Sequence, residues 1–299
     1  MLDFRPITPK DKALYAPYLS IGHKRGCEFS FANLCLWGFQ QATIFENHMV
    51  LFSQFYGLTV YPFPLGKGDK KPVLDAIMAD AKKRGIPCHI TGLDADAKQT
   101  LETLYPGMFH YHCSPGAFDY VYDIHDLADL KGRKYHRKRN HYNRFRETYP
   151  QCSAAPLSGE NLPLVREMID TWYETKLREN PDADFQMEQD ALYKALEQYQ
   201  ALDMDGLVLR SEGQVLAFTL GSQMNEDTFD VHFEKARPEA DGAYAAINCE
   251  FAQYIRSKYP HILYLDREED MGIEGLRKAK QSYYPHHQIE KCRAVLLNN

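Results

Sequence analysis

Long apolar runs are absent from this 299-residue sequence. Runs such as residues 294–297 are far shorter than the ~20 residues that a transmembrane helix needs. Residues 1–6 also lack the basic start and apolar core of a signal peptide. We therefore expect no transmembrane segment and a cytoplasmic location, either free or peripheral at the inner face of the membrane.

Metal-binding and disulfide patterns are absent as well. The seven cysteines, at positions 27, 35, 88, 113, 152, 249 and 292, are odd in number and include no C-x-x-C pair. The twelve histidines form no H-E-x-x-H motif and no Cys/His cluster at ligand spacing. We predict buried free thiols in a reducing compartment and no metal site. The composition, 44% hydrophobic and 25% charged, excludes a disordered or collagen-like chain.

Acidic residues are missing from one segment, residues 131–146, although the whole chain has a net charge of −6. The segment, which we predict to be one helix after Gly132, holds eight basic residues: Lys131, Arg133, Lys134, Arg137, Lys138, Arg139, Arg144 and Arg146. Two interpretations stay open. The helix is either a solvated strut whose charges pair with the acidic body, or a binding site for a polyanion.

As a polyanion site, residues 131–146 suit RNA, such as a tRNA acceptor end, an anionic lipid headgroup or a bound phosphate. The candidate contacts are Lys134, Lys138, Arg139 and His141. Sequence-specific DNA binding is not expected, because no helix-turn-helix or zinc-finger pattern accompanies the segment.

The order of predicted elements repeats in the two halves of the chain. Each half runs strand, two helices, three strands, helix, strand, helix, strand. The three central strands fall at 42–46, 49–55 and 58–63 in the first half, and at 206–210, 215–223 and 228–234 in the second. This order predicts an α+β fold with mostly antiparallel sheets that carry one parallel crossover each. We predict domains at 1–125 and 151–299, joined by a basic linking helix at 126–150.

Titratable residues alternate along the strand at 229–234. Asp230, His232 and Glu234 are predicted on one face, with Phe229, Val231 and Phe233 on the other. Such a row is either a solvated sheet face or the lining of a cleft, where Asp230 and His232 would act as base and orienting group. The helix start that follows offers Asp241, Gly242, Tyr244 and Asn248 as binding candidates, because small residues there expose backbone N–H groups.

A second charged segment, residues 264–285, runs from a predicted strand through an acidic turn into a helix. Its groups serve either as helix caps and surface ion pairs or as a site. In the second case Asp266 orients an acceptor, and cations hold a substrate anion or a developing oxyanion. The further binding candidates are Arg267, Glu269, Arg277, Lys278 and Lys280.

The element order, with a small-residue helix start after the fourth strand, resembles the GCN5-related N-acetyltransferase (GNAT, acyl-CoA N-acyltransferase) fold in tandem, as in the Fem peptidoglycan aminoacyltransferases. Residues 134–141 and 266–280 are similar to those of an uncharacterised bacterial family grouped with the C-terminal catalytic domain of phosphatidylglycerol lysyltransferase. The resemblance covers nearly the whole chain. It implies two GNAT-like domains, each a mixed, mostly antiparallel sheet flanked by helices, and no redox cofactor or metal.

The resemblance also implies transfer of an aminoacyl group from an aminoacyl-tRNA to a lipid or another amine or hydroxyl acceptor, which we expect in an interdomain cleft. Asp230 matches the strand acid of the lysyltransferase domain, but Phe233 stands where that domain has an arginine. Arg237 precedes Gly242 by an interval that does not fit the acetyltransferase pyrophosphate motif. A coenzyme A-dependent N-acetyltransferase is thus the weaker alternative, beside a non-catalytic module that binds RNA or anionic lipid.

Overall fold

The protein consists of two compact units, seen in a computed structural model that describes residues 1–22, 26–55 and 57–297. The first unit comprises residues 1–119, 269–277 and 288–299, and the second comprises residues 120–268 and 278–287. These units differ from the predicted ranges 1–125, 126–150 and 151–299. The basic helix belongs to the second unit, and the C-terminal strand belongs to the first.

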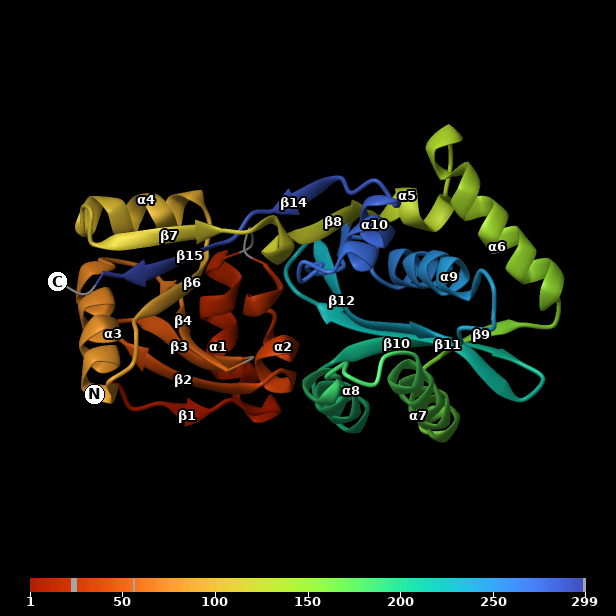
Figure 1. Cartoon of the computed structure of the whole chain (residues 1–299), viewed down its shortest axis with the longest axis horizontal. Coiled ribbons are helices and arrows are strands. Elements are labelled where there is room, and N and C mark those ends of the chain that lie inside the picture. Colours follow the sequence, from red (N-terminus) through yellow and green to blue (C-terminus); the bar gives the residue numbers. More distant parts are fainter. Residues whose placement is uncertain (23–25, 56, 298–299) are drawn as a thin grey trace. The chain divides into compact units, whose positions relative to one another are not determined.

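An eight-stranded sheet forms the first unit (Figure 1). Its strands pair in the order β1-β2-β3-β4-β6-β15-β7, with β5 paired to β3. The strands are β1 (Arg5–Pro6), β2 (Phe39–Phe45), β3 (His48–Phe55), β4 (Leu58–Pro62), β5 (Leu65–Gly66), β6 (His89–Leu93), β7 (Phe109–Cys113) and β15 (Cys292–Leu296). The helices are α1 (Lys12–Leu19), α2 (Phe31–Leu36), α3 (Lys71–Arg84) and α4 (Ala95–Leu104).

A seven-stranded sheet forms the second unit, in the order β14-β8-β13-β12-β11-β10-β9. The strands are β8 (Asp119–Asp123), β9 (Ser153–Pro156), β10 (Met204–Ser211), β11 (Gln214–Gln223), β12 (Thr228–Ala236), β13 (Tyr264–Asp266) and β14 (His287–Ile289). The helices are α5 (Ile124–Asp129), α6 (His136–Thr148), α7 (Leu162–Glu179), α8 (Gln186–Gln198), α9 (Ala243–Lys258) and α10 (Glu274–Gln281).

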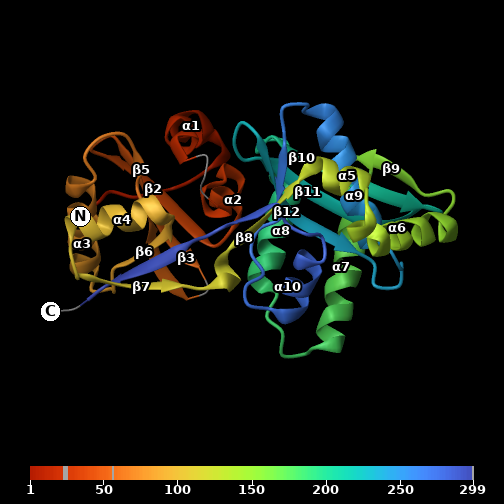
Figure 2. The same ribbon diagram turned by 90° about the horizontal axis from the view of Figure 1, so that it is seen from above.

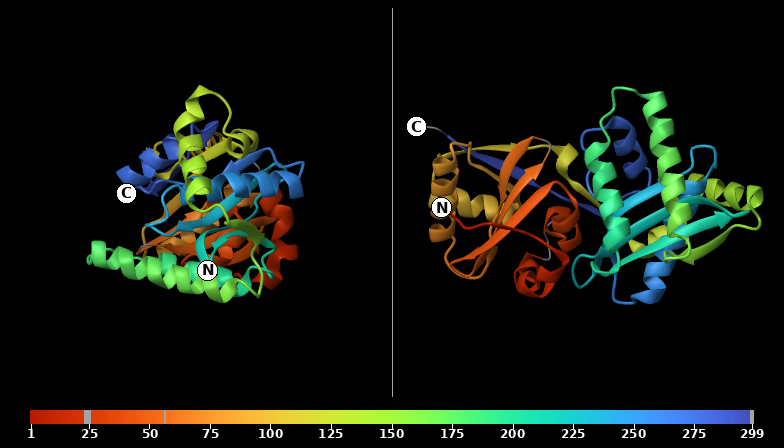
Figure 3. Two further views of the ribbon diagram at one scale, coloured as in Figure 1. Left: turned by 90° about the vertical axis from the view of Figure 1, so that its right-hand side faces the viewer. Right: turned by 90° about the horizontal axis from the view of Figure 1, so that it is seen from below.

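The second sheet is covered on both faces. Helices α5, α6 and α9 share one apolar core with β10, β11 and β12, built around Phe145, Phe229 and Phe251. Helices α7 and α8 lie side by side across the other face (Figure 3), where the Trp172 and Phe185 rings are 6.0 Å apart. None of the described helices combines the length and the apolar composition that crossing a bilayer requires.

The predicted α+β class with two mixed, mostly antiparallel sheets is confirmed, but the predicted path of the chain is wrong at two strands. Strand β8, expected to close the first half, pairs with β13 in the second sheet. The final strand that the element order predicts for the second half is split into β14 and β15, and β15 inserts between β6 and β7 of the first sheet (Figure 2). Neither sheet is therefore built from one contiguous half of the chain.

The cysteine prediction holds for five of the seven residues. Cys27, Cys35, Cys88, Cys152 and Cys249 are buried free thiols. Burial raises the pKa of Cys88 and of Cys249 to about 12, so neither is a reactive thiolate at neutral pH. Cys113 and Cys292 instead form a disulfide, because they are register partners on neighbouring strands β7 and β15.

We predict that this disulfide stabilises the first unit, because it closes a loop between residues 179 positions apart. Replacing both cysteines by serine should lower the free energy of unfolding by about 2–5 kcal/mol in urea titrations under oxidising conditions. A reductant should destabilise the wild type and leave the double variant unchanged. A wild-type midpoint that does not respond to reductant would show that the bond contributes nothing in solution.

Candidate active site

The site begins where two parallel strands of the second sheet separate. Strand β12 pairs with β13 over only three positions, from Thr228 with Tyr264 to Asp230 with Asp266. Beyond this last pair the ladder ends. Strand β12 continues with His232 and Glu234, and the loop after β13 begins with Arg267 and Glu268. In open sheets with parallel strands, ligands bind at the carboxyl ends of the strands. This opening is therefore the expected place for chemistry.

A β-bulge in β12 decides which side chains face each way. Register with β11 runs from Ala236 to Phe233, then shifts so that Gly221 pairs with Val231 and His232 has no partner. The core that contains α9 includes Phe229 and Val231 before the bulge but Ala236 after it, so the alternation changes phase. Gly221 permits this, because a Cβ there would lie 2.3 Å from the carbonyl oxygen of Asp230.

We predicted that Asp230, His232 and Glu234 share one face of the strand. Because of the bulge, this prediction is wrong for Glu234. Asp230 and His232 stay together, whereas Glu234 turns toward α9, where its Oε2 accepts from Asn248 Nδ2 at 3.3 Å. Phe233 no longer shares a face with Val231. The opening therefore carries one set of polar groups on each face of the sheet.

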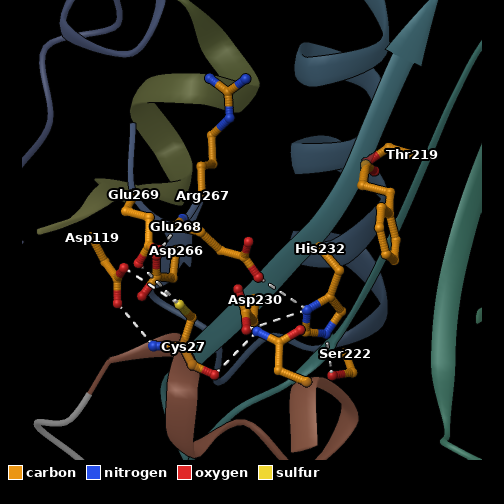
Figure 4. A network of polar contacts seen from close by, with 12 residues as sticks. Cys27, Asp119, Thr219, Ser222, Asp230, His232, Asp266, Arg267, Glu268 and Glu269 are labelled. Atoms are coloured by element: carbon orange, nitrogen blue, oxygen red, sulfur yellow. Dashed lines mark hydrogen bonds and ion pairs between the residues drawn. The ribbon is translucent and has the colours of Figure 1, made fainter. Parts of the chain in front are cut away.

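The first set, the His232 cluster, consists of Ser222, Asp230, His232 and Glu268 (Figure 4). His232 Nε2 lies 2.8 Å from Ser222 Oγ. His232 Nδ1 lies 3.3 Å from Glu268 Oε1 and 3.4 Å from Asp230 Oδ2. The side chains of His232 and Asp230 are fully buried. This is the arrangement of a histidine base held by carboxylates and joined to a hydroxyl.

Asp266 and Lys280 position Glu268 and are not free to act on a substrate. Asp266 Oδ1 accepts the backbone N–H of Glu268 at 2.8 Å. Lys280, which is buried, donates through Nζ to the carbonyl oxygens of Arg267 and Glu268, the latter at 3.0 Å. Asp266 and Lys280, predicted as an orienting acid and an anion binder, therefore both fix the loop that follows β13.

The second set, the Arg267 cluster, lies on the α9 face and consists of Lys138, Glu234, Asn248, Arg267 and Tyr283. Arg267 Nη2 donates to Glu234 Oε1 at 2.9 Å, and its guanidinium lies 5.0 Å from the centre of the Tyr283 ring. Lys138 Nζ from α6 lies 3.7 Å from the same ring centre. Three predicted binding residues, Lys138, Asn248 and Arg267, are thus brought together by three different elements.

Burial, together with repulsion by Arg267, lowers the pKa of Lys138 to about 8, while the attraction of Glu234 opposes the shift. The pKa of Arg267 stays raised, although burial opposes its charge, because Glu234 attracts the guanidinium. At neutral pH both residues are cations that share one contacting carboxylate.

Much of the rest of the basic segment forms ion pairs, as the strut interpretation predicts. Arg139 donates to the carbonyl oxygens of Leu130 and Gly132, which closes the turn before α6. The ion pairs are Lys131–Asp129, Lys134–Asp126, Arg144–Asp241 and Arg146–Glu250. Arg133, Lys134, His136 and Arg137 nevertheless line a hollow of about 690 Å³ with Tyr284. The strut interpretation therefore describes the paired residues, and the polyanion interpretation stays a prediction for the residues that line the hollow.

The start of α9 packs closely against α6. Gly242 has φ +81, and a Cβ at this residue would lie 2.3 Å from the carbonyl oxygen of His141 on α6. Asp241 sits 3.9 Å from His141 and 2.8 Å from Arg144. Asp241, Gly242 and His141, which we predicted as binding residues, therefore take part in the packing of α6 on α9, and Tyr244 is exposed nearby. Their binding role stays a prediction.

The remaining candidates have other partners. Arg277 donates to both oxygens of Asp270, at 2.8 and 3.0 Å, and Lys278 follows it on α10. Glu269 belongs to a buried cluster in the first unit, where Lys291 Nζ contacts Asp119 at 2.8 Å and Glu28 and Glu269 at 3.0 Å each. Burial raises the pKa of Glu28 and of Glu269 against the attraction of Lys291.

Two groups of side chains have ligand atoms close enough for a metal ion: Asp230, His232 and Glu268, and Cys27, Asp119 and Glu269. In the second group, the Lys291 ammonium contacts Asp119 and Glu269 and so already supplies a cation.

Sequence reasoning missed Lys291, Ser222, Glu234 and Glu268 as site residues. Glu234 was noticed on its strand, but no local signal pairs Cys27 with a lysine 264 positions away.

The sheet order and the crossover through α9 define the class: a tandem GNAT-like acyltransferase fold. Residues 20–295 match the family described as phosphatidylglycerol lysyltransferase, C-terminal, and the chain belongs to this family. Membership and fold together support a transferase of the acyl or aminoacyl type.

Solved structures agree with this fold. A conserved protein of unknown function from Bacteroides thetaiotaomicron is 36% identical, with a TM-score of 0.92 over 99% of this chain and 100% of that one. The C-terminal domain of a candidate lysylphosphatidylglycerol synthetase from Agrobacterium fabrum has a TM-score of 0.68 at 11% identity, over 97% and 93% of the two chains. FemX has a TM-score of 0.62 at 12% identity, over 99% and 98%.

An uncharacterised protein of Mycoplasmoides gallisepticum is 22% identical over 177 residues, which are 58% of this chain. The match spans 54% of that relative's length.

The Arg267 cluster generates a prediction about Lys138. In NMR spectra of the protein with ¹³C-methylated lysines, one lysine, assigned with K138R, should titrate near pH 8. Because Glu234 raises this pKa, E234Q should lower it further, while E239Q, at an exposed carboxylate, should not. A Lys138 midpoint near the ordinary value of about 10.4 would contradict the burial of its ammonium.

Proposed function

We propose that this protein is an aminoacyltransferase that moves an aminoacyl group from an aminoacyl-tRNA to a hydroxyl or amine acceptor, with a lipid headgroup as the leading acceptor. The observation that carries the proposal is the His232 cluster: a buried imidazole between two carboxylates and a hydroxyl, at the opening of β12 and β13. Family membership supports the reaction class.

The geometry assigns a role to each group. Asp230 and Glu268 hold the Nδ1–H of His232, which leaves Nε2 as the basic nitrogen toward Ser222. The acceptor proton passes through the Ser222 hydroxyl to Nε2 while the acceptor bonds to the aminoacyl carbonyl carbon. The ester C–O bond to the ribose then breaks, and the proton returns to the ribose oxygen, so the residues are restored.

The basic segment supports an anionic donor. Arg133 and Arg137 have no ion pair with any described residue, and both line the hollow that Tyr284 completes. Tyr284 is exposed and has φ +53, a conformation that a tyrosine rarely adopts. Cations beside an exposed ring suit the phosphates and bases of a single-stranded end. Coenzyme A remains the alternative donor.

We predict that H232Q lowers the rate of aminoacyl transfer by about 10²–10⁴-fold, the range for loss of a general base. The assay follows labelled amino acids from charged tRNAs into anionic lipids and soluble amines. H261Q, the same change at an exposed histidine, should keep the wild-type rate. Unfolding midpoints separate lost chemistry from lost folding.

Wild-type activity in H232Q would refute the role of His232. Acetyl-CoA consumption without transfer from any charged tRNA would instead favour the coenzyme A alternative, and absence of both would favour a non-catalytic module.

A further inference from the structure

The Arg267 cluster carries more positive charge than its protein contacts neutralise. Lys138 and Arg267 are both cations at neutral pH, and Glu234 is the carboxylate that contacts the guanidinium. Burying a charge without a counter-charge is costly. The lowered pKa of Lys138 is one expression of that cost. An anion placed between the two cations would remove it.

Three polar atoms of the cluster lack hydrogen-bond partners among the described residues. Arg267 Nη1 is a buried donor without an acceptor. Asn248 is 3% exposed, and because its Nδ2 donates to Glu234, its Oδ1 remains a buried acceptor without a donor. The half-buried Lys138 ammonium rests on the Tyr283 ring with no acceptor in the described chain. Buried polar groups without partners are rare in folded proteins and need an explanation.

The geometry points to a binding site for a phosphate ester, formed by Lys138 and Arg267 as donors to its oxygens and by Asn248 Oδ1 as acceptor from a neighbouring hydroxyl. A phosphate is favoured over a carboxylate because the site offers two cations, and because the orphaned Asn248 acceptor requires a donor on the ligand. Glu234 holds Arg267 and Asn248 in place and does not contact the ligand.

This inference rests on the proposed function, because the site flanks the same strand opening as the His232 cluster, on the opposite face of the sheet. A hydroxylated phosphate ester occurs both in a lipid headgroup and at the ribose end of a nucleic acid. The same donors and acceptor suit both sources, so experiment must separate them.

The test measures the unfolding midpoint with and without phosphate compounds, at constant ionic strength set by chloride. Glycerol 3-phosphate or AMP at saturating concentration should raise the wild-type midpoint by about 2–4 °C, since a ligand that binds only the folded state stabilises it. The compound with the larger rise identifies the lipid-like or nucleotide-like source. Acetate, which has neither the hydroxyl nor a second charge, should produce a smaller rise.

Variants locate the site. K138M and N248L should each weaken binding of the better compound at least tenfold by calorimetry. K131M, which removes the same charge from an exposed lysine of the same segment, should bind like the wild type. A K138M protein that folds and binds with wild-type affinity would overturn the proposal, and so would a midpoint that responds to phosphate esters no more than to chloride.

The pH dependence provides a second readout. The second pKa of a phosphate monoester is about 6, so above pH 7.5 only the protein changes charge. Lys138 faces Arg267, Glu234, Arg137 and Tyr283, and its pKa is about 8, so affinity should fall as the pH rises from 7.5 to 9.5. In K138M this fall should vanish. Binding is measured without donor or acceptor, so a failed transfer assay leaves this result intact.

Discussion

The pairing of β12 with β13 is the contact on which the rest of the candidate site depends. The two strands are parallel, so their carboxyl ends meet at one edge, and their ladder stops at Asp230 and Asp266. Because pairing stops there, the following residues separate and leave backbone and side chains free for other contacts. The bulge at His232 then divides these side chains between the two faces of the sheet. A ladder two residues longer would bring His232 and Glu268 into register and close the opening.

The path of the chain explains why neither half is a separate module. Strand β8 leaves the first half to pair with β13, and β15 returns from the C-terminus to separate β6 from β7. A fragment that ends at residue 150 would lack β15, and β7 would lose its partner. Each sheet therefore needs strands from both ends of the sequence.

Local patterns predicted what depends on local physics. The ends of two helices carry such local signals: Gly85 adopts φ +68 after α3, and Asp94 caps α4 by accepting from the backbone N–H of Ala97. Alternation along β12 identified Asp230 and His232, but it could not show the bulge, whose signal is Gly221 on the neighbouring strand. The sequence analysis predicted that the cationic residues of α10 bind a substrate anion. Charge alone could not show that Lys280 is buried and donates to backbone carbonyl oxygens. The Cys113–Cys292 bond was missed because only the swapped strand makes the two residues neighbours.

The distribution of charge around the opening fits two requirements of the proposed reaction: a base that accepts a proton and a site that binds an anion. Carboxylates gather around His232 on one face, where they lie close to its Nδ1 and orient the ring. Cations gather around Tyr283 on the other face, where they favour an anion. If both sets shared one face, the carboxylates would pair with Lys138 and Arg267, and neither the base nor the anion site would remain available. The bulge in β12 sends Glu234 to the cationic face, where it holds Arg267, and leaves Asp230 and His232 together on the other, so this irregularity helps to make both functions compatible.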